Sequence, residues 1–256
     1  MREKEISIIG AGVVDVLAGA VDEKIFSSGS TPMDFIKMSF GGDALNEAVV
    51  LSRLGKKVQW ISKIGDDEAG KKILNYATEN GLSVEHLKVE AGLATSITIV
   101  LVEKSGERFF LTNPHASMRK LAAEDILPYV DEMADIVSFA SMFISTTLDI
   151  AATERIFKKI KAAGKILAFD MKFPHNGETL QDMKGMLSNA DYFFPNEEEL
   201  ATLTGETDID KNISALLNCD WSSDVCSSDL SCSVEEIGAV TGVTSLEKVM
   251  SRYKLF

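Results

Sequence analysis

Short apolar runs alternate along this chain with amphipathic stretches that have a helical period. The apolar runs predict strands, and the amphipathic stretches predict helices bounded by Gly41–Gly42–Asp43 and Gly55, by Asn80–Gly81, and by Gly205. Strands separated by helices favour an α/β fold, with a mainly parallel sheet covered on both faces. Strands are expected at residues 6–9, 58–61, 136–139, 166–170 and 192–194, and helices at 43–55, 67–79, 122–129, 151–163 and 197–203.

One segment departs from this alternation. Residues 95–102 and 108–111 are β-rich and flank Lys104–Ser105–Gly106, which predicts a β-hairpin. The hairpin, together with residues 16–40, is expected to form an addition to the parallel sheet.

Composition narrows the class of protein. The chain has 256 residues, of which 45% are hydrophobic, so it is long enough for one α/β domain. Its net charge of −13 argues against a broad basic surface, and no nucleic-acid partner is expected. Residues 6–20 are apolar, but the preceding MREKE is as acidic as it is basic and Asp15 interrupts the run. A buried strand is therefore favoured over a signal peptide, with no membrane span and a cytoplasmic location expected.

All three cysteines, Cys219, Cys226 and Cys232, fall within 14 residues. Their spacing does not fit a zinc site, and no other feature suggests an oxidising compartment. Residues 220–230 read DWSSDVCSSDL, which is one translated frame of a widely used sequencing adapter. Residues 219–230 are therefore interpreted as an adapter-derived artefact and are excluded from fold reasoning. Residues 231–256 form a tail of unknown origin, and their faint likeness to a helix-turn-helix is not favoured.

Candidate chemistry lies where ligands bind in such sheets, just beyond the carboxyl ends of the strands. Gly10 and Gly12 form part of a dinucleotide fingerprint, but Asp15 replaces its third glycine. A tight turn and a carboxylate that accepts hydrogen bonds from sugar hydroxyls are the other readings. Gly41 and Gly42, before a helix that carries Asn46, are typical either of close ligand approach or of a helix start capped by Asp43.

Several motifs in order along the chain carry a family resemblance. Residues 41–70, GGDALNEAVVLSRLGKKVQWISKIGDDEAG, contain a glycine pair with an Asn, then R-L-G, and then G-D-D-x-x-G. GERFFL at 106–111, a strand ending at Asp170, and PNEEEL at 195–200 follow. Together they resemble the ribokinase-like (PfkB) carbohydrate kinases over about residues 4–218. The resemblance implies a ribokinase-like three-layer sandwich with a small β lid from about 16–40 and 94–112.

The resemblance also implies a sugar site. Asp15, Gly41, Gly42 and Asn46 would hold the hydroxyls of a small sugar or nucleoside, and the lid would exclude water from phosphoryl transfer. Lys172 stands where the family often has an Asn and an Arg. It is a further candidate for contact with the substrate or with phosphate, and a solvated loop lysine is the alternative interpretation. A homodimer through the lid is an additional expectation.

The implied cofactors are ATP and Mg²⁺, and a monovalent cation stays open. Asn196 and Glu199 match the family's N-x-x-E motif, so Glu199 is the expected Mg²⁺ residue, acting through water. The same two residues also read as a helix N-cap with acids in the first turn, and both readings can hold.

The family's second signature, D-T-x-G-A-G-D, supplies its catalytic Asp and an anion hole, and it does not occur in these 256 residues. No catalytic residue is therefore assigned. Residues 1–218 are interpreted as a partial domain that lacks the C-terminal part of the fold and is inactive alone. The parent protein is expected to be an ATP-dependent sugar kinase. A non-catalytic sugar or nucleotide binder and an NAD-dependent oxidoreductase are the alternatives.

Overall fold

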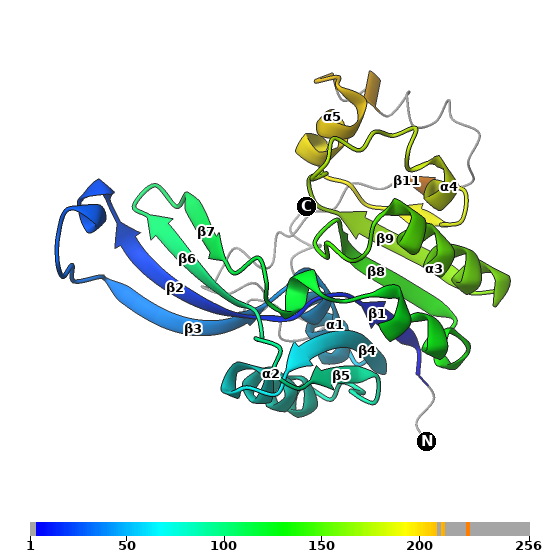
Figure 1. The fold of residues 1–256 in the computed structure, drawn as a ribbon, viewed down its shortest axis with the longest axis horizontal. Helices are drawn as coiled ribbons and strands as arrows, with labels where there is room; N and C mark the ends of the chain where they lie inside the picture. Colours follow the sequence, from blue (N-terminus) through cyan, green and yellow to red (C-terminus); the bar gives the residue numbers. More distant parts are fainter. Residues whose placement is uncertain (1–3, 209–210, 213–223, 226–256) are drawn as a thin grey trace, which may run out of the picture.

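The computed structural model describes residues 4–208, 211–212 and 224–225, and its largest element is a parallel sheet (Figure 1). The strand order is β11-β10-β9-β8-β1-β4-β5, and each neighbouring pair runs parallel. The strands are β1 (Ile6–Ile9), β4 (Val58–Gly65), β5 (Leu87–Glu90), β8 (Ile136–Met142), β9 (Ile166–Met171), β10 (Tyr192–Phe193) and β11 (Asp224–Val225).

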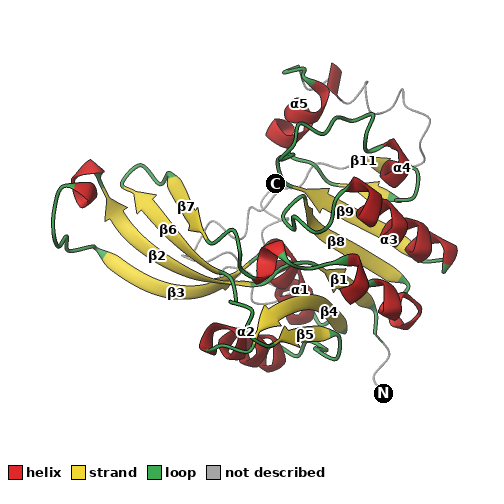
Figure 2. Cartoon of the chain, in the orientation of Figure 1, coloured by secondary structure: helices red, strands yellow, loops and turns green. Residues whose placement is uncertain are grey.

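Helices cover both faces of this sheet and make a three-layer sandwich (Figure 2). Neighbouring residues of a strand point to opposite faces, so Ile8 packs in the core with α1 and α2, while Ile9 packs in the core with α3, α4 and α5. This confirms the predicted α/β architecture. The helices are α1 (Asp43–Arg53), α2 (Glu68–Glu79), α3 (Ile150–Ala162), α4 (Lys184–Leu187) and α5 (Glu197–Thr204), with 3-10 segments η1 (Glu23–Phe26), η2 (Ser117–Arg119), η3 (Ala123–Asp125) and η4 (Leu127–Glu132).

A second, four-stranded sheet extends from the side of the first and forms the predicted lid (Figure 1). Its order is β3-β2-β6-β7, with the predicted hairpin at β6–β7. The chain passes from β1 into β2 almost directly, and β3 leads into α1. The lid is therefore joined to the central sheet at the C-terminal end of β1 and at the N-terminal end of α1. Its strands are β2 (Val13–Val21), β3 (Phe35–Gly41), β6 (Ile97–Glu103) and β7 (Arg108–Thr112).

The G-D-D-x-x-G motif ties the lid to the sandwich. The Asp67 carboxylate accepts hydrogen bonds from the backbone N–H of Gly70 at 2.8 Å, as the cap of α2, and of Thr95 at 2.8 Å. Thr95 in turn accepts a bond from the Gly65 N–H at 2.8 Å. A Cβ at Gly65 would lie 1.9 Å from the Leu93 carbonyl oxygen, so the close approach requires glycine. The motif thus anchors the start of β6.

Two predicted elements need correction, and one strand was not predicted. Residues 122–129 form the 3-10 segments η3 and η4 in place of one helix, since Pro128 lacks an N–H for a helical hydrogen bond. Asp15 lies within β2, whereas a turn was the simplest reading. The short strand β5 was not predicted, because LKVE is half polar and lies at an edge of the sheet.

The cysteines and residues 231–256 lie outside the described residues, so their interpretations stay predictions. Within the segment attributed to the adapter, Asp224–Val225 is described and pairs with β10. A strand edge has unpaired N–H and C=O groups that an extended segment of any sequence can pair with. Across the described part of the chain, the helices are all too short or too polar to span a bilayer.

Candidate functional site

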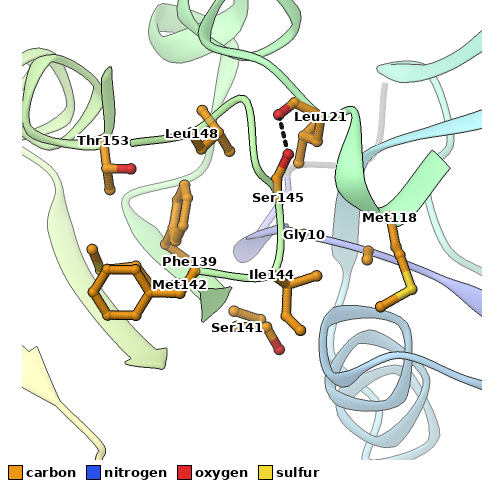
Figure 3. Close-up of a pocket in the computed structure, with 13 residues that line it drawn as sticks. Gly10, Met118, Leu121, Phe139, Ser141, Met142, Ile144, Ser145, Leu148 and Thr153 are labelled. Atoms are coloured by element: carbon orange, nitrogen blue, oxygen red, sulfur yellow. Dashed lines mark hydrogen bonds between the residues drawn. The ribbon is translucent and has the colours of Figure 1, made fainter. Parts of the chain in front are cut away.

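The strand order reverses at β1, and the candidate site lies at this point. From β1 the chain adds β4 and β5 on one side and then β8, β9 and β10 on the other. Parallel α/β sheets bind ligands at such a reversal, beyond the carboxyl ends of the strands. A pocket opens there between the ends of β1 and β8 (Figure 3). Its walls are mostly apolar and include Met118, Leu121, Phe139, Met142, Ile144 and Leu148, with Gly10 and Ser141 also at the pocket.

The structure brings Asp15 and the glycine pair together at the base of the lid. A Cβ built on Gly41 would lie 2.0 Å from Oδ2 of Asp15, so the carboxyl group packs against the bare glycine backbone. Gly42 has φ of 90° and is the N-cap of α1, without a side-chain cap. Asn46 lies in the first turn of α1, half-buried, and its backbone N–H bonds to the Gly42 carbonyl. The structure thus places Asp15 against Gly41 and places Asn46 one helical turn after the glycine pair, and the binding roles of these residues stay a prediction.

Asp43 does not cap α1, contrary to the simplest reading of the sequence, because the helix already begins at this residue. Its Oδ2 instead lies 3.1 Å from Nζ of Lys172, which comes from the end of β9. The same oxygen accepts a hydrogen bond from the Ser141 hydroxyl. An ion pair thus joins the start of α1 to the end of β9 across the site.

Ser141 is the residue that links these elements. Its N–H donates to Oδ1 of Asp170 while its hydroxyl donates to Asp43. Ser141 and Phe143 have φ of 58° and 73°, a left-handed conformation that is uncommon outside glycine. This turn at the end of β8 directs both donors of Ser141 toward carboxyl groups. Strain of this kind tends to occur at functional sites.

Carboxyl groups in the site hold protons more tightly than usual. Burial, and then the nearby Asp43 charge, raise the pKa of Asp15 to about 6. The same two causes raise the pKa of Asp170 to about 8. Burial raises the pKa of Glu47 to about 7, against a 3.0 Å hydrogen bond from the Ser138 hydroxyl. Burial acts to lower the pKa of Lys172. The charges of Asp43 and Asp170 outweigh this effect, so the pKa of Lys172 is raised.

Asn196 and Glu199 form a reciprocal capping box at the start of α5. Oδ1 of Asn196 accepts the Glu199 N–H at 2.8 Å, and Oε2 of Glu199 accepts the Asn196 N–H at 2.9 Å. The structural reading of the motif is therefore correct. No described residue bonds to Oε1 of Glu199, so that atom could face a Mg²⁺-bound water. Within the described residues no three His, Cys, Asp or Glu side chains are grouped to hold a metal directly.

The dinucleotide reading of Gly10 and Gly12 is not supported by the local fold. That fingerprint needs a strand, a glycine turn and then a helix whose N-terminus meets the pyrophosphate. Here β1 is followed by the strand β2. A Cβ at Gly12 would lie 2.7 Å from the Trp60 ring, so this glycine makes room for a core side chain.

Sequence reasoning missed Asp43, Ser141 and Glu47 as members of the site. Asp43 directly after a glycine pair was a usable signal, because the helix start it occupies was already a candidate. Ser141 and Glu47 depend on β8 lying beside β1, which no local pattern shows.

Residues 4–220 match the family described as pfkB family carbohydrate kinase. Among curated relatives, fructokinase-2 of Solanum lycopersicum is 29% identical over 177 residues, which cover 66% of this chain and 54% of that protein. The chain spans about half the length of the curated relatives it matches.

Solved structures share the fold. A fructokinase from Xylella fastidiosa with bound ATP superimposes with a TM-score of 0.68 at 24% identity, covering 88% of this chain and 72% of that one. The ribokinase of Arabidopsis thaliana, complexed with ribose and ATP, has a TM-score of 0.69 at 18% identity with the same coverages.

Proposed function

Because this chain belongs to the pfkB family of carbohydrate kinases, we propose that its parent protein transfers the γ-phosphoryl group of ATP to a hydroxymethyl group of a small sugar. The observation that carries the proposal is the Asp15 carboxyl group packed on Gly41 at the base of the lid, where β3 leads into α1. The names of the relatives make fructose the first substrate to test, then ribose and nucleosides.

Each proposed role follows from the chemistry of a side chain. The Asp15 carboxylate would accept hydrogen bonds from two sugar hydroxyls, and Asn46 and the open backbone at Gly41–Gly42 would complete the polar contacts. A closed lid would exclude water, so that the sugar hydroxyl and not water receives the phosphoryl group.

ATP and Mg²⁺ are the proposed cofactors, and Mg²⁺ would neutralise charge on the phosphate oxygens. Oε1 of Glu199, which bonds to no residue in the described part of the chain, would suit a water bound to Mg²⁺, while Asn196 holds Glu199 in place through the capping box. A monovalent cation is not supported by any feature of the described residues. We assign no base to take the hydroxyl proton.

Activity of the parent protein is tested by ADP release against a panel of sugars and nucleosides. The longer protein should release sugar-dependent ADP, whereas the 256-residue chain should release none, because D-T-x-G-A-G-D does not occur in it. Sugar-dependent ADP formation by the 256-residue chain would contradict the proposed inactivity. A longer protein that binds ATP and sugar without turnover would favour the non-catalytic binder.

The lid is also proposed to join two copies of the chain. Val16, Met38, Ile99 and Leu111 are neighbours on one face of the lid, opposite the face that carries Asp15. Met38, Ile99 and Leu111 are 58%, 42% and 52% exposed. Contiguous exposed apolar surface of this kind is typical of an interface.

A charge on that face should therefore separate the copies. Leu111→Glu is expected to convert a dimer into a monomer in light scattering, because an ionised carboxyl group cannot be buried there without a partner. Val89→Glu, at a 49% exposed position on β5, is the matched control and should leave the mass unchanged. A monomeric unmodified chain would contradict the proposed dimer.

A further inference from the structure

Lys172 follows the end of β9 at the candidate site, where it forms an ion pair with Asp43. Nζ of Lys172 lies 3.1 Å from Oδ2 of Asp43, and both side chains are about two-fifths exposed, at 40% and 41%. The Ser141 hydroxyl bonds to the same Asp43 carboxyl group, which fixes its orientation. The ammonium group is therefore already paired before any substrate enters.

Asp43 lies within electrostatic reach of the other acids of the site. Its charge raises the pKa of Asp15, Glu47, Asp170 and Glu199. Lys172 in turn interacts with the charges of Asp43, Asp170 and Glu199. The Asp43 carboxylate thus balances the charge of Lys172, and the pair offers an incoming anion no net attraction.

A second cation lies near the pocket, but it is engaged elsewhere. Nη1 of Arg119 donates to the Ile144 carbonyl at 2.9 Å and lies 3.2 Å from Nε2 of His175. Arg119 is not among the charges that shift the pKa of Asp15. Arg119 therefore does not restore the positive charge that Asp43 neutralises at Lys172.

We infer that Asp43 makes this site selective for uncharged sugars, because its carboxylate neutralises Lys172 and so denies an anionic sugar its counter-ion. The inference rests on the proposed sugar-kinase function and names Asp43 as a specificity-determining residue. A sugar phosphate or sugar acid would have to displace Asp43 from Lys172 and would then face Asp15 and Asp43 without compensation. ATP differs, since it arrives with Mg²⁺, which carboxylates attract.

The test compares neutral and anionic sugars on the 256-residue chain by isothermal titration calorimetry. Fructose and ribose are titrated beside fructose 1-phosphate and ribose 5-phosphate, into the unmodified chain and into Asp43→Asn, Lys172→Met and Asp131→Asn. Asp131 is the matched control, because it is exposed in η4, which leads into the opposite end of β8 from Ser141. Melting temperatures show whether each variant folds.

The unmodified chain should bind at least one neutral sugar at least tenfold more tightly than its monophosphate. Asp43→Asn should reduce the ratio of the two dissociation constants, monophosphate over neutral sugar, about tenfold. This is the effect of removing one unit charge some 6 Å from the phosphate in a partly solvated site. Lys172→Met should widen the ratio by a similar factor, because Asp43 is then uncompensated. Asp131→Asn should leave it unchanged.

Two results would overturn the inference while leaving the sugar-kinase proposal standing. One is tighter binding of a monophosphate than of its parent sugar by the unmodified chain. The other is an unchanged ratio in folded Asp43→Asn, or in Lys172→Met if Asp43→Asn does not fold. Absence of binding to every sugar, neutral and anionic, would contradict both the inference and the proposed sugar site.

Discussion

Raising the pH from 5 to 8 should destabilise this protein, and Asp170→Asn should remove much of that loss. Asp170, Glu47 and Asp15 have pKa values raised to about 8, 7 and 6, mainly because burial disfavours the charged carboxylate. In the unfolded chain these groups ionise near pH 4. Between these values the folded state binds more protons than the unfolded state, so the free energy of unfolding falls as the pH rises.

The direction is fixed by the sign of the shift. A raised carboxyl pKa leaves stability fully present below about pH 4 and removes it as the pH rises through the folded pKa. One group held protonated across this window changes the free energy of unfolding by about 1.4 kcal/mol per pH unit. Asp170 alone should therefore account for about 3 kcal/mol between pH 5 and 8, after some relaxation of the site.

Urea unfolding at four pH values between 5 and 8 measures this effect. Asn at position 170 is neutral throughout and keeps an oxygen that can accept the Ser141 N–H. For Asp170→Asn, the plot of unfolding free energy against pH should be flatter than for the unmodified chain. Asp131→Asn serves as the exposed control. Parallel plots for Asp170→Asn and the unmodified chain would show that Asp170 is ionised in the folded state.

The sequence predicted the part of this site that contains Asp15, Gly41 and Gly42. Gly41 and Gly42 are needed because Asp15 and the backbone at Ala11 approach them closely, and glycine is the residue that local patterns identify best. The parallel sheet and the lid hairpin were equally accessible, since their apolar periods are local. The nine-residue strand β2 was missed, because its VVDVLAGAV sequence lacks regular alternation.

The rest of the site depends on long-range pairing. Asp43, Ser141, Asp170 and Lys172 meet because β8 lies between β1 and β9, and strand order is not written in any single segment. Ser141 has a positive φ with no glycine to signal it. Asp43 was read as a helix cap because an acid at a helix start has an adequate local explanation. Because this local explanation was adequate, it gave no reason to expect the contacts of Asp43 with Lys172 and Ser141.

Gly41→Ala should cost the largest part of the sugar affinity of this chain. The new Cβ would lie 2.0 Å from Oδ2 and 2.9 Å from Cγ of Asp15, so the carboxyl group must leave its position. In catalysis a misplacement of about 1 Å can cost a factor of about 100, and we expect a loss of similar size in sugar binding. Gly41→Ala should therefore weaken binding of the preferred neutral sugar about 100-fold, and Asp15→Ala should do so at least as strongly, both measured by titration calorimetry.

The double variant decides whether Gly41 acts through Asp15. If the glycine serves only to admit the carboxyl group, Gly41→Ala should add little to the loss already caused by Asp15→Ala, because the two changes remove the same interaction. Gly29→Ala is the matched control, since a Cβ there meets no atom within 4 Å. Two losses that simply add would show that Gly41 contacts the sugar independently of Asp15. Unchanged affinity in folded Gly41→Ala would remove Asp15 from the sugar site altogether.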